Sequence, residues 1–193
     1  QGLPRVEELF EARNPKGKAT ISEVSGTVAS IKEDNGKYRI VVENEAEARE
    51  HVTNYNMKLR VHEGDKVEAG DKLTEGVISP KELLAVTDPI TAQEYILKEI
   101  QMVYKLQGVD INDKHIEVIV KRMINKVRIV DAGDTDLVEG LSVSLREFTE
   151  ANKPVILAGK VPAKGRPIML GITKSSLQTD SFLSAASFQE TTR

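Results

Sequence analysis

The chain has 193 residues, no cysteine, 39% hydrophobic residues and a formal net charge of −3. The absence of cysteine excludes disulfides and thiolate metal sites. No apolar run approaches the roughly 20 residues of a membrane helix. We therefore expect a cytoplasmic protein with no membrane partner. The net charge argues against a free-standing nucleic-acid-binding domain, but basic residues gather at both ends, since residues 1–18 carry +1, residues 19–152 carry −8 and residues 153–193 carry +4.

The first predicted element is a helix within residues 1–18. Pro4 suits the first helical position, and four apolar residues share one helical face: Leu3, Val6, Leu9 and Phe10. Asn14 precedes Pro15 and is therefore biased out of the helical region, so the helix should end before it.

Residues 19–80 change to the period of two that is typical of strands. Strands are expected around Ile21, at 26–28, around Ile31, at 38–42 and at 57–61, with a hairpin turn at residues 34–37. Two Gly-Asp pairs, at 64–65 and 70–71, predict repeated tight turns. This pattern resembles the small barrel-sandwich hybrid module of carrier domains and of RNA polymerase large subunits.

Residues 81–126 are expected to form a helical hairpin. Thr91 and Glu94 predict a capping box at the start of the first helix, and Gly108 predicts its end. Asn112 or Asp113 should cap the second helix. Each helix carries an apolar stripe, with Ile96, Leu97, Ile100, Val103 and Tyr104 in the first and Ile116, Ile119, Val120, Met123 and Ile124 in the second.

Residues 127–170 are predicted to return to short strands, at 127–130, 141–145, 155–157 and 168–170, with turns at 132–134, 139–140 and 163–165. Residues 171–193 carry a helical apolar stripe capped by Thr179 or Asp180, and they stop at Arg193 with nothing to close the helix. This ending predicts a piece of a longer polypeptide. The expected fold class is α+β, a barrel-sandwich hybrid module with a helical hairpin and further short strands.

No autonomous active site is visible in the sequence. The sequence has no GxSxG motif, no Walker loop, no HExxH metalloprotease motif and no dinucleotide-binding fingerprint. No acidic cluster surrounds His51 or His62. His115 and Glu117 are two residues apart, which places them on different helix faces and disfavours a shared metal. We therefore expect neither a catalytic residue nor a metal site. A remote alternative is a lipoyl or biotinyl carrier domain, whose modified lysine would be Lys58 in the Met-Lys-Leu segment at 57–59.

Three long motifs in order carry a family resemblance: GLPRV with ELFEAR at 2–6 and 8–13, YKLQGV with INDKHIEV at 104–109 and 111–118, and LGITK onward from 170. They resemble the beta-prime subunit of bacterial DNA-directed RNA polymerase, at the jaw and first switch segment that follow the trigger loop. Residues 7–17 and 131–136 are more similar to Firmicute sequences than to proteobacterial ones.

The resemblance implies a nucleotidyltransferase in transcription, whose jaw and clamp base guide downstream DNA. It implies contacts with DNA at Arg13, Lys32, Lys37, Lys174, Gln189, Thr192 and Arg193. Asn35 occupies a position that is basic in some relatives. The implied partners are the beta, alpha and omega subunits, sigma factor and DNA. The family's Mg²⁺-binding aspartates are absent, so the fragment should hold no cofactor and be inactive alone, with Mg²⁺ bound elsewhere in the enzyme.

A second hypothesis remains open, in which this surface is mainly a docking platform for regulators of the polymerase jaw. The acidic middle of the chain would suit a basic partner. DNA guidance predicts binding that weakens steeply with salt and depends on Lys32, Lys37 and Lys174. Docking predicts dependence on the surface of residues 91–125 instead.

Overall fold

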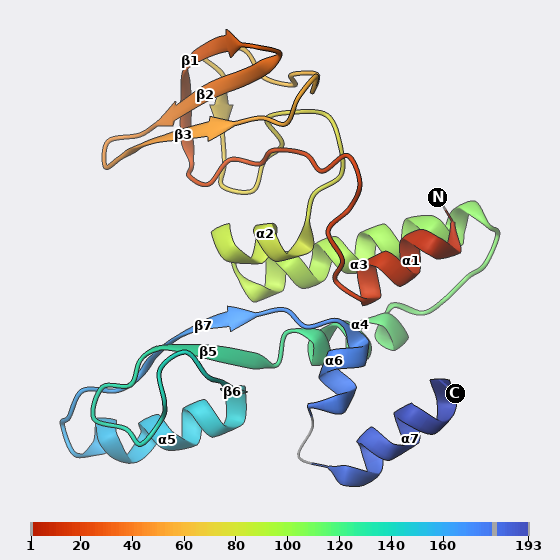
Figure 1. Ribbon diagram of the computed structural model, residues 1–193, viewed down its shortest axis with the longest axis vertical. Coiled ribbons are helices and arrows are strands. Elements are labelled where there is room, and N and C mark those ends of the chain that lie inside the picture. The colour runs from red at the N-terminus through yellow and green to blue at the C-terminus, as the bar shows by residue number, and fades with distance from the viewer. Residues whose placement is uncertain (1, 179–180, 193) are drawn as a thin grey trace. The chain divides into compact units, whose positions relative to one another are not determined.

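The computed structural model describes residues 2–178 and 181–192 and is of the α+β class, as predicted (Figure 1). It divides into two compact units. One runs from Asn14 to Ala92, and the other combines the residues before Asn14 with those after Ala92.

The unit of residues 14–92 is built on a curled antiparallel sheet with strand order β3-β2-β1-β4 (Figure 1). Its strands are β1 (Gly26–Asp34), β2 (Lys37–Glu43), β3 (Ala48–Val52) and β4 (Lys66–Val67), and helix α2 (Pro80–Val86) follows them. Aliphatic side chains fill the curl, because the sequence offers few aromatics: Val24, Val28, Ile40, Val42, Val61, Val67 and Leu73.

The two Gly-Asp turns have the same construction, as their sequence repetition predicts. Gly64 and Gly70 have φ angles of 90° and 93°. In each turn the Asp65 or Asp71 carboxylate accepts a hydrogen bond from the backbone amide three residues earlier, at 2.8 Å in both. The side chain of each aspartate therefore closes the turn that its glycine permits.

Two parts of this unit differ from prediction. Residues 57–61 form no extended strand, and only an isolated bridge joins Leu59 to Thr74. In contrast, β3 was not predicted, because it carries the charged pair Arg49 and Glu50 and only His51 in it is buried. Such a composition is common in edge strands, where one side of the ladder has no partner.

The predicted first helix and helical hairpin are present as α1 (Leu3–Phe10), α3 (Pro89–Leu106) and α4 (Asp113–Met123). Asn112 caps α4, and its side-chain oxygen accepts the amide hydrogen of Lys114 at 3.0 Å. In α1 only Val6 and Leu9 are buried, whereas Leu3 is exposed.

The predicted capping box at Thr91 and Glu94 is wrong. Helix α3 begins earlier, and Asp88 accepts hydrogen bonds from the Thr91 amide at 2.8 Å and from its hydroxyl at 2.9 Å. Thr91 is thus a donor within the first turn rather than the cap. These hydrogen bonds, the backbone one foremost, hold the pKa of Asp88 below its usual value.

The segment from 126 to 168 forms a second antiparallel sheet, of order β6-β5-β7, with a helix: β5 (Lys126–Asp131), β6 (Ser142–Ser144), α5 (Leu145–Leu157) and β7 (Lys164–Ile168). The predicted strand at 155–157 is wrong because these residues end α5. Ser144 caps this helix by accepting from the Glu147 amide at 3.1 Å, and Pro154 lies inside it. The predicted turn at 163–165 and strand at 168–170 are displaced, since β7 already begins at Lys164.

The chain continues through α6 (Ile172–Leu177) to α7 (Phe182–Thr192). The apolar stripe predicted here is split between these two helices, and Phe182 and Leu183 are 83% and 77% exposed. The predicted caps Thr179 and Asp180 lie outside the described residues.

Candidate nucleic-acid interface

The β1–β2 hairpin presents two of the predicted DNA-contacting residues. Asp34 pairs with Lys37, which leaves Asn35 and Gly36 as the turn, with φ angles of 50° and 76°. Two consecutive positive φ angles are the mark of a type I′ turn, which the Asn-Gly sequence favours. A Cβ at Gly36 would lie 2.6 Å from the ring of Tyr55, so this exposed ring would have to move aside.

The strand alternation places Lys32 and Lys37 on the solvent-facing side of the hairpin. Ile31, Tyr38 and Ile40 belong to the other side and pack on the core. Both lysines are exposed, and within the described residues neither forms an ion pair. Their ammonium groups are therefore available to an anionic ligand.

Arg39 is a third cation on this face, and the sequence reading missed it. It lies opposite Lys32 in the strand register. Its guanidinium contacts Glu50 at 2.8 Å and Asp34 at 4.0 Å, and the hydrogen bond with Glu50 raises its pKa above the ordinary value. Positions 32 and 39 are equally far from the turn, which could have revealed Arg39, but its nearer partner Glu50 lies on β3 and could not be read from the hairpin alone.

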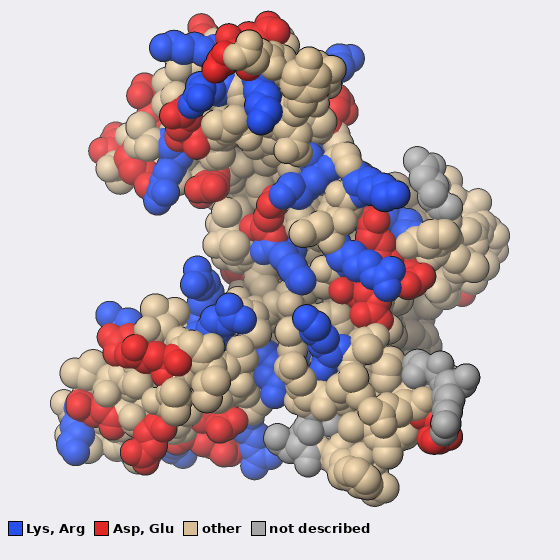
Figure 2. Space-filling model, viewed as in Figure 1, with Lys and Arg blue, Asp and Glu red and all other residues tan. Residues whose placement is uncertain are grey.

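Figure 2 shows that acidic side chains interrupt the basic ones over the part of the molecule that holds β1, β2 and β3. The surface is thus a mixture of both signs rather than a uniformly positive patch. Individual long side chains such as Lys32 and Lys37 would have to reach phosphates between neighbouring carboxylates.

Arg13 and Lys174 belong to the other unit and lie on segments that meet. Arg13 follows the end of α1, and its guanidinium pairs with Glu7 at 3.0 Å. Lys174 is exposed on α6. The two segments are joined by Glu11, whose carboxylate accepts a hydrogen bond from the Thr173 hydroxyl at 2.6 Å.

The remaining predicted contacts lie at the end of the chain. Gln189 is exposed on α7, whereas the Thr192 side chain and Arg193 lie outside the described residues. Because Lys32 and Lys37 belong to one unit and Arg13 and Lys174 to the other, the convergence of all four on one groove stays a prediction.

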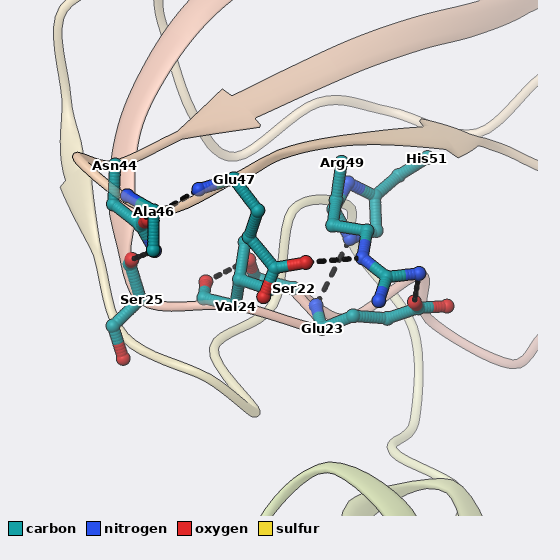
Figure 3. Close-up of polar contacts among 9 residues, drawn as sticks. All are labelled: Ser22, Glu23, Val24, Ser25, Asn44, Ala46, Glu47, Arg49 and His51. Carbon is teal, nitrogen blue, oxygen red and sulfur yellow. Dashed lines mark hydrogen bonds and ion pairs between the residues drawn. The ribbon is translucent and has the colours of Figure 1, made fainter.

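The buried histidine has a structural role at the edge of the sheet (Figure 3). Nε2 of His51 accepts the Glu23 amide hydrogen at 2.9 Å, and Nδ1 lies 3.3 Å from the Ile40 carbonyl oxygen. Beside it, Arg49 contacts Glu47 at 2.8 Å and Glu23 at 4.0 Å. Both ring nitrogens are occupied by backbone groups, so this histidine has no lone pair to offer a metal.

The other histidines, His62 and His115, are exposed. In the part of the chain that the structure describes, no three His, Cys, Asp or Glu side chains come together as a metal site. Lys58, the candidate of the carrier hypothesis, accepts the Glu75 amide hydrogen at its carbonyl at 2.8 Å. It therefore lies in a paired segment and not at a hairpin tip. Among residues 2–178 and 181–192, no helix is both long and apolar enough to span a membrane.

Comparison with known proteins agrees with the resemblance found in the three motifs. The family model described as RNA polymerase Rpb1, domain 5, matches residues 4–180. The DNA-directed RNA polymerase subunits beta' of Bacillus licheniformis and Bacillus subtilis are each 61% identical to the chain over 194 residues, and that of Geobacillus kaustophilus is 58% identical. These matches cover 100% of the chain but only 16% of each relative, so it spans about a sixth of their length. The chain belongs to the RNA polymerase Rpb1, domain 5, family.

Proposed function

We propose that the chain acts within a bacterial DNA-directed RNA polymerase, as the jaw and switch part of the beta-prime subunit, and that it guides downstream duplex DNA. In this role it contributes no catalytic group. The nucleotidyl transfer and the Mg²⁺ that supports it belong to other parts of the enzyme. The beta, alpha and omega subunits and sigma factor are its partners in the cytoplasm.

The observation that supports this proposal most is the outward face of the β1–β2 hairpin. Lys32 and Lys37 are carried next to a tight turn on strands whose other side is packed in the core. Long lysine side chains on such a rigid support can reach a phosphate while their stems stay solvated. Contacts of this kind hold DNA without reading its sequence, as a channel that accepts any template requires.

The test is the salt dependence of binding to a short duplex of arbitrary sequence, measured by fluorescence anisotropy. Each phosphate contact contributes about 0.9 to the slope of log K against log salt. The double variant Lys32→Ala, Lys37→Ala should lower this slope by about 1.8, which is about a twelvefold change in the ratio of affinities at about 50 and 200 mM salt.

The matched control is Lys66→Ala, which removes an exposed lysine of the same sheet from β4, away from the hairpin turn. It should leave the slope within error of the unchanged chain. Equal slopes for the control and the hairpin double variant would refute the proposed role of the hairpin.

A groove on the helical hairpin favours regulator docking as a second candidate function. It is lined by Leu97, Lys98, Gln101, Met102, Lys105, Leu106 and Asp113. Met102 and Leu106 are exposed apolar side chains beside two lysines. Leu106→Asp separates the two functions. It places a charge in the apolar groove and should weaken the binding of a regulator there, but it should leave the salt slope for DNA binding unchanged.

A further inference from the structure

Glu11, the C-cap residue of α1, forms a hydrogen bond with the first turn of α6. Its Oε1 accepts the Thr173 hydroxyl hydrogen at 2.6 Å. A Cβ on Gly171 would lie 2.5 Å from the carbonyl oxygen of Glu11 and 2.8 Å from its Oε2. Position 171 therefore admits no side chain, and the missing side chain is what lets Glu11 approach the start of α6.

Helix α6 lacks an N-cap side chain of its own. Its N-cap is Gly171, which offers no side-chain oxygen to the first-turn amides. Glu11, which is distant in sequence, holds this end of α6 through the Thr173 side chain instead. On its other side α6 is held by α4, because the Ser175 hydroxyl donates to the Arg122 carbonyl at 3.0 Å and the Leu170 amide donates to the Met123 carbonyl at 2.8 Å.

Two of the predicted DNA contacts of this unit are close in sequence to the Glu11–Thr173 pair. Lys174 follows Thr173 directly, and Arg13 is two residues after Glu11. Loss of the pair would leave the end of α1 and the start of α6 able to move independently. Yet a carboxylate at this place should by itself repel DNA, so its presence has to be explained by what it holds.

We infer that Glu11 is a positioning residue, which fixes the start of α6 against the end of α1 and thereby holds Lys174 and Arg13 in a set relation for binding phosphates. The inference rests on the proposed function for its DNA part, but the clamp itself is independent of DNA. Glu11 contacts no phosphate in this role and acts only through Thr173 and the backbone of Gly171.

Two pairs of variants of the full chain separate positioning from charge. Glu11→Gln removes the charge but keeps an acceptor for Thr173, whereas Glu11→Ala removes both. Likewise Thr173→Ser keeps the hydroxyl donor, whereas Thr173→Val keeps the shape and loses it. A merely electrostatic role predicts that the two Glu11 variants behave alike and that both Thr173 variants are silent.

The first measurement uses no DNA and follows hydrogen exchange at the Ser175 amide, which donates to the Gly171 carbonyl at 2.9 Å and closes the first turn of α6. Glu11→Ala and Thr173→Val should exchange about tenfold faster at this amide, because loss of one charge-assisted hydrogen bond that anchors the first turn makes local opening of that turn easier. Glu11→Gln and Thr173→Ser should exchange like the unchanged chain. Equal exchange in all five proteins would overturn the inference.

The second measurement is the salt slope for duplex DNA, with Lys174→Ala as the reference. Glu11→Ala and Thr173→Val should lower the slope by about one contact, or about 0.9, and Glu11→Gln should bind at least as tightly as the unchanged chain. Tighter binding by Glu11→Ala would overturn the positioning role. A silent Lys174→Ala would instead overturn the proposed DNA contact, while the exchange rates would still decide whether Glu11 holds α6.

Discussion

Arg13 is engaged by Glu7, and this ion pair predicts an unusual gain of DNA affinity from a single substitution. Nη1 of Arg13 lies 3.0 Å from Oε1 of Glu7, and the two side chains are 61% and 62% exposed. A DNA phosphate that binds Arg13 must compete with this carboxylate. Glu7→Gln removes the competing charge while it keeps the length and shape of the side chain.

The size of the gain follows from the exposure of the pair. Ion pairs between solvent-exposed side chains contribute about 0.2–1 kcal/mol, because water screens them well. Release of Arg13 should therefore raise the DNA affinity by about 1.4- to 5-fold. A larger gain in DNA affinity would require a buried ion pair, whereas Arg13 and Glu7 are both exposed.

The assay is anisotropy with a labelled duplex at fixed salt, in a double-mutant cycle with Arg13→Ala. Glu7→Gln should tighten binding in the unchanged chain and have no effect when Arg13 is already alanine. Glu117→Gln, on the exposed face of α4, controls for the simple loss of one negative charge. The reasoning is refuted if Glu7→Gln tightens binding equally in the Arg13→Ala background, or if the control matches it.

Three further predictions concern stability. Ile40→Ala, at a fully buried core position of β2, should lower the free energy of unfolding by about 2–5 kcal/mol, measured by denaturant titration. Gly36→Ala should lower the melting temperature, because φ is 76° and the Tyr55 ring occupies the space, whereas Gly64→Ala meets no atom within 4 Å and tests the strain of positive φ alone. The lowered pKa of Asp88 means that its ionised form stabilises α3 at pH above about 3.9, and that this contribution is lost as the pH falls through the folded-state pKa. Asp88→Asn should thus flatten the acid limb of a stability-against-pH curve below about pH 4, and an unchanged limb would contradict the assignment.

The elements that were predicted correctly are fixed by interactions between residues that are close together in the sequence. The Asn35-Gly36 turn fixes the register of β1 and β2, since both residues tolerate positive φ. Helix α4 begins where Asn112 can accept an amide hydrogen two residues later. In both cases the deciding residues lie within a few positions of one another, so they can be recognised in the sequence.

The errors occur where a local signal competes with a second one. Val155 and Ile156 are β-branched and favour a strand, but they continue a helix that Ser144 already caps. Thr91 and Glu94 fit a capping box, but Asp88 lies three residues before Thr91 and is the stronger acceptor. In both helices the residue that decides the start, Asp88 or Ser144, lies upstream of the competing signal.

The candidate site could be predicted only as separate residues. The exposure of lysines at a hairpin follows from the alternation of strand residues. The ion pair of Arg39 with Glu50 also requires the position of β3, which was not predicted. The contact between Glu11 and Thr173 joins residues 162 positions apart. No periodicity or motif within a window of the chain can reveal such a pair, because it depends on the tertiary packing of α1, α4 and α6.

The most direct test of DNA guidance is a map of where DNA lies against the hairpin. The chain has no cysteine, so Asn35→Cys gives a single attachment point for an iron chelate that cleaves nearby DNA, and Glu45→Cys gives a matched exposed point beyond the other end of β2. Bound duplex should be cut over a short stretch from residue 35 and far less from residue 45. Equal cutting from the two positions, or none from residue 35, would contradict the account.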